Sequence, residues 1–488
     1  MPPFEPVIGL EVHAELLTRS KMFCACAVVD LTRAEANTSV CEICTGMPGT
    51  LPVINQRAIE YALRVALALQ CEIAETSVFA RKNYFYPDLP KGYQISMYEL
   101  PLASNGLLHF RMNEGEKRVR IRRVHLEEDT GKLIHRDGYS LVDYNRSGVP
   151  LLEIVTEPDL HSMDEVKSFS HAVRTLLRYL QVSSGDMEKG VIRFEANVSI
   201  RPVGSEELGT RTEIKNLNSF RAMVHALTYE VQRQSEILAD GGEVVQETVG
   251  WDNARGITIS QRSKEEAHDY RYFPEPDLPP LHIDPVWIDQ VKAELPELPT
   301  EKANRFQRQY HLTPYTGDIL VAERAVADFF EVAASSSEDA PADKIAHWIT
   351  GDLFGLLNQA GIEIDESNVS PQSLAELVAM VERGEINATS GKAVLAEMFA
   401  TGGEPSAIVE KSGLLQLNDP QAINVLVEQV LEDNPEQVRL FLQGKATLSE
   451  WFFGQVMRAT RGRANPSIVR SSLDKALKRL EDSRHSSL

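Results

Sequence analysis

The stretch IGLEVHAEL, residues 8–16, sets the character of the first part of the chain. Its polar and apolar residues alternate with a period of two, which is typical of a β-strand with one polar and one apolar face. The polar face carries Glu11, His13 and Glu15. Two carboxylates and an imidazole on one strand could bind a divalent cation or exchange protons. The same pattern fits the wetted face of an edge strand, so both interpretations stay open at this point.

Up to about residue 270 the sequence mixes helical and strand patterns, separated by Gly, Pro and Asn. Apolar side chains at helical spacing predict helices over residues 56–69 and 163–180, and a third helix is predicted over residues 219–238. Ser162 and Glu165 have the spacing of a capping box at the start of the second helix. The patterns of this part therefore indicate a mixture of sheet and helices.

Proline marks the end of the mixed region. Seven prolines fall between residues 274 and 299, where each fixes φ and removes a backbone donor. We expect an extended, stiff connector there, with a domain boundary near residue 293. The sequence beyond it is rich in Ala, Glu, Leu and Lys, with a break at residues 401–405. The last helices are predicted over residues 420–431, 435–442, 447–460 and 466–480.

The length of 488 residues suits about three domains. We expect an α+β fold in which a domain with a mixed or antiparallel sheet covers residues 1–293. An all-helical domain over residues 294–405 and a small helical tail over residues 406–488 should follow it.

The composition excludes several classes of protein. Hydrophobic residues make up 43% and charged residues 25%, which is ordinary for a globular chain and rules out a disordered or fibrous one. The net charge of −21 excludes a uniformly basic coat for nucleic acid, although not a local basic patch. The start MPPFEP resembles no signal peptide, and no uncharged apolar run reaches about 18 residues. We expect a cytoplasmic protein with neither a membrane nor DNA among its partners.

Four of the five cysteines form two close pairs, Cys24 with Cys26 and Cys41 with Cys44. Two thiol pairs joined by a short loop suit a tetrahedral structural Zn²⁺ site, which leaves no open position for catalysis. The first pair is C-x-C rather than the commoner C-x-x-C, and the alternative is four unrelated core residues. Cys71 stands alone and is expected to be a packed residue rather than a nucleophile.

Charged side chains at two further places could take part in binding or catalysis. Arg118, Arg120 and Arg122 share one face of a predicted strand, and the acidic run 127–129 follows directly. Arginines neutralise phosphate oxygens and carboxylates hold Mg²⁺, so the segment could bind a phosphorylated ligand with its cation, or be an exposed strip of paired charges. Glu153 lies inside an apolar run, where a carboxylate is costly unless it is paired, metal-bound or on a wetted strand face.

Two other segments could contact nucleotides. RKNYFYPDLPKGYQ, residues 81–94, interleaves aromatic rings with basic and amide groups that could stack a base, although aromatic clusters are more often core. Residues 454–488 carry eight basic and three acidic residues, which suits contact with a phosphate backbone or an ordinary basic helix. There is no G-x-x-x-x-G-K-[ST], no G-x-G-x-x-G and no kinase signature set, so any ATP chemistry needs a different cradle.

Several long blocks of the sequence resemble the GatB family, the B subunits of the aspartyl/glutamyl-tRNA amidotransferases. The resemblance runs in order from residue 8 to about residue 470. The blocks are IGLEVHAEL, CEICTGMPGTLPV, RKNYFYPDLPKGYQIS, HLEEDTGK, DYNRSGVPLLEIVTEPD, TEIKNLNSF, DYRYFPEPDLPPL and RGRANPSIV.

The resemblance implies a heterotrimer in which GatB works with an amidase (a glutaminase) and with a small bridging protein. The amidase releases ammonia from glutamine. GatB uses ATP to phosphorylate the side-chain carboxylate of Glu misattached to tRNA(Gln), or of Asp misattached to tRNA(Asn), and ammonia then displaces the phosphate. The resemblance also implies three parts: an α+β cradle, a helical domain and a tail that contacts tRNA.

The resemblance implies roles for residues as well. Glu11, His13, Glu127 and Glu153 match the Mg²⁺-binding kinase site, and the four cysteines match the zinc-bearing branch of the family. As contacts to the nucleotide we select four residues: Arg120, Arg122, Tyr86 and Lys91. Lys91 and Glu128 are also candidates for an internal ammonia passage. The competing hypotheses are a free-standing metal hydrolase and a non-catalytic, zinc-stabilised tRNA-binding subunit.

Overall fold

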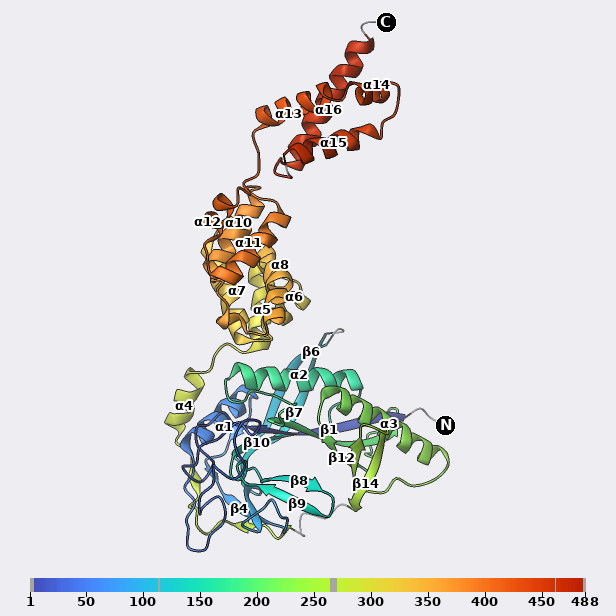
Figure 1. Ribbon diagram of the computed structural model, residues 1–488. Coiled ribbons are helices and arrows are strands. Elements are labelled where there is room, and N and C mark those ends of the chain that lie inside the picture. The colour runs from blue at the N-terminus through green and yellow to red at the C-terminus, as the bar shows by residue number, and fades with distance from the viewer. Residues whose placement is uncertain (1–3, 113–114, 264–269, 461, 486–488) are drawn as a thin grey trace. The chain divides into compact units, whose positions relative to one another are not determined.

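The computed structural model describes residues 4–112, 115–263, 270–460 and 462–485 (Figure 1). The chain divides into two compact units, Met1–Lys302 and Ala303–Leu488. The first unit is built on a large sheet, and the second is helical. The α+β class expected from the sequence is confirmed.

Within the described part of the first unit, twelve strands form one sheet. The order is β14-β13-β12-β11-β1-β10-β7-β5-β4-β15, with β6 bridging β7 and β2. Neighbouring strands are antiparallel except for the parallel pair β12 and β13. The strands are β1 (Phe4–Glu15), β2 (Glu72–Ile73), β4 (Phe79–Asn83), β5 (Tyr93–Met97), β6 (Ala103–Met112), β7 (Gly115–Glu128), β10 (Pro150–Thr156), β11 (Ile192–Pro202), β12 (Thr212–Leu217), β13 (Glu247–Asp252), β14 (Ile257–Ser263) and β15 (Phe273–Pro274).

Two small strand pairs accompany the sheet. The strand β3 (Thr76–Ser77) pairs with β16 (Leu281–His282), and β8 (Lys132–Arg136) pairs with β9 (Tyr139–Asp143). The hairpin β8–β9 lies on the opposite side of the sheet from helix α2 (Figure 1).

One face of the sheet is closed by helices. These are α1 (Gln56–Ala68), α2 (Met163–Tyr179) and α3 (Phe220–Ala239). Leu10 and Val12 of β1 are buried in the same apolar core as Phe169 of α2 and Met223 of α3. Because successive side chains of a strand point to opposite faces, this core forces the polar residues of β1 to the other face of the sheet.

The predicted start of α2 is confirmed in part. Ser162 precedes the helix, and its Oγ accepts a hydrogen bond of 3.2 Å from the backbone N–H of Glu165. The Glu165 carboxylate does not return to the cap residue, as a full capping box requires, but accepts from the backbone N–H of His161 at 2.7 Å.

The proline-rich segment differs from the extended connector that was expected. Residues Pro285–Ala293 form helix α4, which begins with Asp284 as its N-cap. Proline at the first helical position supports a helix because its fixed φ suits the first turn and its missing N–H would be unpaired there. Val291 of α4 is buried in the core of the first unit, so the segment belongs to that unit.

The second unit has two separate apolar cores. The first core lies among helices α5 to α12 and the second among α13 to α16. The helices are α5 (Pro299–Tyr310), α6 (Pro314–Leu320), α7 (Arg324–Ser336), α8 (Ala342–Trp348), the π-helix η2 (Ile349–Leu353), α9 (Phe354–Ala360), the 3₁₀ helix η3 (Ile364–Glu366), α10 (Pro371–Glu382), α11 (Ala388–Thr401), α12 (Pro405–Lys411), α13 (Pro420–Glu432), α14 (Pro435–Leu442), α15 (Leu448–Ala459) and α16 (Pro466–His485).

The four helices predicted near the C-terminus are confirmed, and the last one extends further than expected, to His485. The division into three domains stays a prediction: there are three apolar cores, but the second extends past residue 405 to Ile408 and Val409. None of the helices in the described ranges is both long and apolar enough to cross a membrane.

Candidate functional site

The pairing of β1 with its two neighbours gathers acidic side chains on the open face of the sheet. His13 lies opposite Glu153 of β10, and Glu11 lies opposite Glu195 of β11. Residues directly opposite each other in antiparallel strands point to the same face. On the next strand, β7, His125 lies opposite Glu153, and Glu127 lies two residues further along, opposite Leu151 of β10 and Ser96 of β5.

A change of register in β7 makes this arrangement possible. Val155 pairs with Arg123 but Thr156 pairs with Ile121, so Arg122 is the extra residue of a β-bulge. After the bulge the alternation of the strand changes phase: Val119 and Ile121 are buried in the core before it, and Val124 and Leu126 after it. The bulge thereby turns three polar residues of β7 to the open face: Arg123, His125 and Glu127.

We call the group Glu11, His13, Glu127, Glu153 and Glu195 the acidic cluster. The Nδ1 atom of His13 lies 3.7 Å from Oε1 of Glu127 and 3.9 Å from Oε2 of Glu153. Ligand atoms of His13, Glu127 and Glu153 lie within 4.8 Å of one another, and so do those of Glu11, His13 and Glu195. The four residues selected from the sequence thus come together, in two overlapping sets that share His13.

The ionisation of the cluster reflects its excess of negative charge. Burial lowers the pKa of His13, but the hydrogen bond to Glu127 and the charge of Glu153 outweigh it and raise the pKa to about 9. Burial and the neighbouring Glu153 and Glu195 raise the pKa of Glu11. Burial also opposes ionisation of Glu153, yet attraction to His125 and His13 holds the pKa of Glu153 well below its usual value. The cluster therefore favours positive charge at its centre.

The cluster fits a hard divalent cation. Its donors are carboxylate oxygens and one imidazole, and oxygen ligands are those that Mg²⁺ prefers. Asn197 donates from Nδ2 to Oε1 of Glu11 at 2.9 Å. Its buried Oδ1 has no hydrogen-bond partner within the described residues, and neither has the buried Nδ1 of His125. Buried polar atoms left open beside a ligand set are typical of a site that takes an ion with its water.

Sequence reasoning missed several neighbours of the cluster. Glu195 and Asn197 lie on β11 and alternate with buried apolar residues in the segment IRFEANV, residues 192–198. This period of two is the signal that could have found them. Lys215 of β12 donates to Oε2 of Glu195 at 2.7 Å, and His125 lies 3.2 Å from Glu153, so both supply positive or polar partners to the acids.

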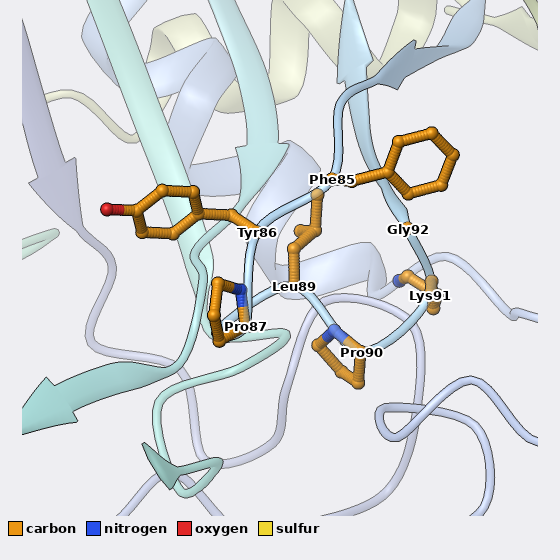
Figure 2. Close-up of a pocket in the computed structure, with 7 residues that line it drawn as sticks. All are labelled: Phe85, Tyr86, Pro87, Leu89, Pro90, Lys91 and Gly92. Atoms are coloured by element: carbon orange, nitrogen blue, oxygen red, sulfur yellow. The ribbon is translucent and has the colours of Figure 1, made fainter. Parts of the chain in front are cut away.

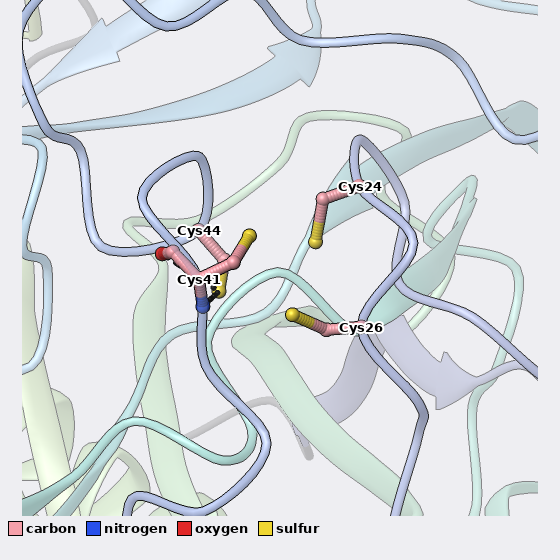
Figure 3. A group of neighbouring side chains, drawn as sticks. All are labelled: Cys24, Cys26, Cys41 and Cys44. Carbon is pink, nitrogen blue, oxygen red and sulfur yellow. Dashed lines mark hydrogen bonds between the residues drawn. The ribbon is translucent and has the colours of Figure 1, made fainter.

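The four paired cysteines also come together (Figure 3). Their sulfur atoms all lie within 4.8 Å of one another. The backbone N–H of Cys41 donates to Sγ of Cys44 at 3.2 Å. A hydrogen bond from Cys24 and the Cys41 N–H outweigh burial and lower the pKa of Cys44 to about 4. Four sulfur donors at this spacing form a possible metal site of the closed, structural kind.

A buried lysine lies against the cysteine group. The Lys21 side chain is fully buried, and its Nζ lies 3.6 Å from Sγ of Cys44. The same ammonium donates to the backbone oxygens of Ser39 at 2.8 Å and of Tyr144 at 3.2 Å. A buried cation favours negative charge nearby, so Lys21 favours thiolates over neutral thiols.

The two arginines selected as nucleotide contacts have ion-pair partners of their own. Arg120 is bound to Asp159, with a shortest distance of 2.6 Å, and Arg122 to Glu157 at 2.8 Å. Their side chains are 66% and 54% exposed, so this segment has the character of a strip of paired charges. Their role in nucleotide binding stays a prediction.

The aromatic segment forms a surface hollow with Tyr86 and Lys91 in its lining (Figure 2). Phe85 and Tyr86 are exposed rather than packed in the core. Lys91 is largely buried and forms an ion pair with the buried Glu128. That pair lies one residue from Glu127 of the acidic cluster, and its part in an ammonia passage stays a prediction.

Two family models match the chain. The model described as the GatB/GatE catalytic domain matches residues 6–289, and the model described as the GatB domain matches residues 328–477. The sheet and the acidic cluster therefore lie in a catalytic domain of the GatB/GatE class.

Three relatives are named as the B subunit of an aspartyl/glutamyl-tRNA(Asn/Gln) amidotransferase. The protein of Persephonella marina is 50% identical over 475 residues, which cover 97% of this chain and 100% of the relative. Those of Thermodesulfovibrio yellowstonii and Thermomicrobium roseum are 49% and 50% identical and cover 97% of this chain and 99% of each relative. The chain belongs to the GatB family, as the sequence blocks indicated.

The cysteine group generates a direct prediction. The purified chain should contain about one equivalent of zinc, because four thiolates in a tetrahedral arrangement are typical ligands of a structural Zn²⁺. The double variant with Cys41→Ser and Cys44→Ser should lose nearly all of it, measured by elemental analysis after gel filtration. Cys71→Ser removes a thiol outside the group and serves as the control. Equal zinc content in all three proteins would remove the site.

Proposed function

We propose that this chain uses ATP to activate the side-chain carboxylate of the amino acid on a misacylated tRNA, and that the activated group is then amidated. Membership of the GatB family makes the chain part of a tRNA-dependent amidotransferase. The observation that supports the chemical role is the meeting of Glu11, His13, Glu127 and Glu153 on one face of the sheet. The substrates are Glu-tRNA(Gln), Asp-tRNA(Asn) or both.

The residue types suit the chemistry. A carboxylate resists attack by ammonia because its carbon is a poor electrophile and oxide is a poor leaving group. When the carboxylate oxygen attacks the γ-phosphorus of ATP, ADP leaves and an acyl phosphate forms. Ammonia then attacks the acyl carbon, and phosphate leaves with the bonding electrons. Positioning and charge neutralisation dominate such a phosphoryl transfer, and no covalent help from the protein is needed.

The acidic cluster would hold Mg²⁺ through Glu11, His13, Glu127 and Glu153. The bound cation would neutralise charge on the phosphoryl oxygens. Asn197 orients Glu11 through its hydrogen bond, and His125 and Arg123 hold Glu153 ionised. The chain's own contribution is thus to keep Glu153 ionised and to place the carboxylates together on one partly buried face of the sheet.

The same proposal includes partners and a location. The chain works in the cytoplasm with the family's amidase and its small bridging protein. Ammonia made by the amidase reaches the acidic cluster past Lys91 and Glu128. The cysteine group holds zinc and stiffens the loop around residues 24–44.

The alternative is a protein that presents tRNA to the amidase complex and performs no chemistry. It differs from the main proposal in what happens when a cluster carboxylate is removed. Glu11→Ala or Glu153→Ala should lower tRNA-dependent ADP formation at least about 100-fold, because a charge that acts on the transition state is lost. Binding of tRNA should stay within about twofold of the wild type in the reconstituted complex.

The control for this experiment is Glu116→Ala, which removes an exposed carboxylate from the same strand as Glu127. It should leave both measurements unchanged. Full ADP formation in both cluster variants would favour the tRNA-presenting alternative. ADP formation without tRNA and without the partner proteins would instead favour a metal hydrolase.

The basic tail generates a prediction about tRNA. Lys475 and Lys478 are exposed on α16. If they contact phosphates, the combined variant with Lys475→Ala and Lys478→Ala should bind tRNA more weakly. Its slope of log affinity against log salt should be shallower by about 1 to 2, because tRNA binding releases fewer counterions when fewer phosphates are neutralised.

Arg33→Ala removes an exposed cation of the first unit and serves as the matched control. Affinities measured by filter binding between low and physiological salt give the slope. An unchanged slope in the Lys475 and Lys478 variant would count against the tail as a binding surface.

A further inference from the structure

Lys82 extends the polar face of the sheet beyond the acidic cluster. On β4 it lies opposite Gln94 of β5, and Ser96 of β5 lies opposite Glu127. Residues two apart on one strand share a face, so Lys82, Gln94, Ser96 and Glu127 all belong to the open face. Lys82 is thus a cation on the same face as Glu127, and it comes from the aromatic segment that also carries Tyr86 and Lys91.

The ammonium of Lys82 differs from the other cations of this face. Lys215 donates to Glu195 at 2.7 Å, and Arg193 donates to Asp129 at 2.8 Å. The Lys82 side chain is half-buried, and its ammonium forms no hydrogen bond and no ion pair with any residue that the structure describes. An ammonium withdrawn from water without a partner is costly, which indicates that a ligand completes its bonds.

Aromatic rings hold this ammonium in place. The Nζ atom lies 5.1 Å from the ring centre of Tyr270 and 5.9 Å from that of Tyr84. Ring faces attract a cation but use none of its N–H groups in hydrogen bonds. Burial alone lowers the pKa of Lys82, but the charges of Glu127 and other acidic groups outweigh it and raise the pKa. The side chain is therefore held charged, with its donors available.

A second cation stands on the same side of the cluster. The guanidinium of Arg123 lies 5.7 Å from the ring centre of Tyr98, which stacks on Tyr272 at 4.1 Å. Arg123 approaches Glu153 at 3.6 Å, yet its buried Nε has no hydrogen-bond partner among the described residues. The hydrogen-bond donors of Lys82 and Arg123 are thus flanked by tyrosine rings on the side of the sheet that carries Glu127 and Glu153.

The charges decide which ligand fits between them. A free anion is repelled by Glu127 and Glu153, and a free cation is repelled by Lys82 and Arg123. A phosphoryl group that arrives with a divalent cation satisfies both sides, because the cation meets the carboxylates and the phosphoryl oxygens meet the ammonium.

We propose that Lys82 is a catalytic residue whose ammonium bonds to oxygens of the phosphoryl group during its transfer. This inference rests on the function proposed above. In the step, a carboxylate oxygen of the aminoacyl group forms a bond to the γ-phosphorus. The bond from that phosphorus to the bridging oxygen breaks, and ADP keeps the electron pair. Lys82 offsets charge on the transferred oxygens and gives up no proton.

The test is Lys82→Met, which keeps the length and apolar stem of the side chain and removes the charge. In the complex reconstituted with its partner proteins, ADP formation that depends on misacylated tRNA should fall at least about 100-fold under single-turnover conditions. Binding of tRNA should stay within about twofold of the wild type. Lys82→Arg should recover part of the rate, since it restores a cation.

Lys132→Met, which removes an exposed lysine on β8, is the matched control and should leave the rate unchanged. ADP formation at the wild-type rate in Lys82→Met would overturn the inference. If the same variant then amidated slowly even with added ammonium salt, Lys82 would belong to the ammonia step instead. If Lys82→Met lost both tRNA binding and ADP formation, the inference would also be overturned, because the lysine would then be structural. A wild-type complex that forms no tRNA-dependent ADP would instead refute the proposed function itself.

Discussion

Repulsion between carboxylates that the sheet holds together is the constraint on which the rest of the structure depends. Glu11, Glu127, Glu153 and Glu195 project from strands whose opposite faces are locked into an apolar core under three helices. They cannot move apart without unpacking that core. Burial and this repulsion raise the pKa of Glu11. Burial lowers the pKa of His13, but the hydrogen bond to Glu127 and the charge of Glu153 outweigh it and raise that pKa to about 9.

The cysteine group supports this face from the side. A Cβ atom on Gly46 would lie 2.6 Å from Cγ of Lys91, so the loop that carries Cys41 and Cys44 packs directly against that lysine. Lys91 in turn holds Glu128, the neighbour of Glu127. Lys21 ties the same loop to the backbone of Tyr144. A metal in the cysteine group would therefore stiffen one wall of the candidate site without taking part in chemistry.

Period-two alternation was enough to predict β1 and the shared face of Glu11 and His13, and sequence blocks were enough for the family. The β-bulge at Arg122 could not be predicted, because an extra residue leaves no periodic signal and changes which side chains of β7 face the cluster. Helix α4 was missed because proline was taken for a helix breaker, whereas at the first helical position it favours a helix. Lys82 belongs to the segment that was predicted to stack a base, but only the fold shows that it shares a face with Glu127.

The most direct measurement of the central claim is the position of a manganese ion in crystals of the chain soaked with ATP. Manganese takes the oxygen ligands that magnesium prefers, and its anomalous scattering identifies it. The account predicts one strong peak within about 2.5 Å of carboxylate oxygens of the acidic cluster, with the terminal phosphate of ATP beside it. A peak bound by other residues, with no ion among these carboxylates, would contradict it.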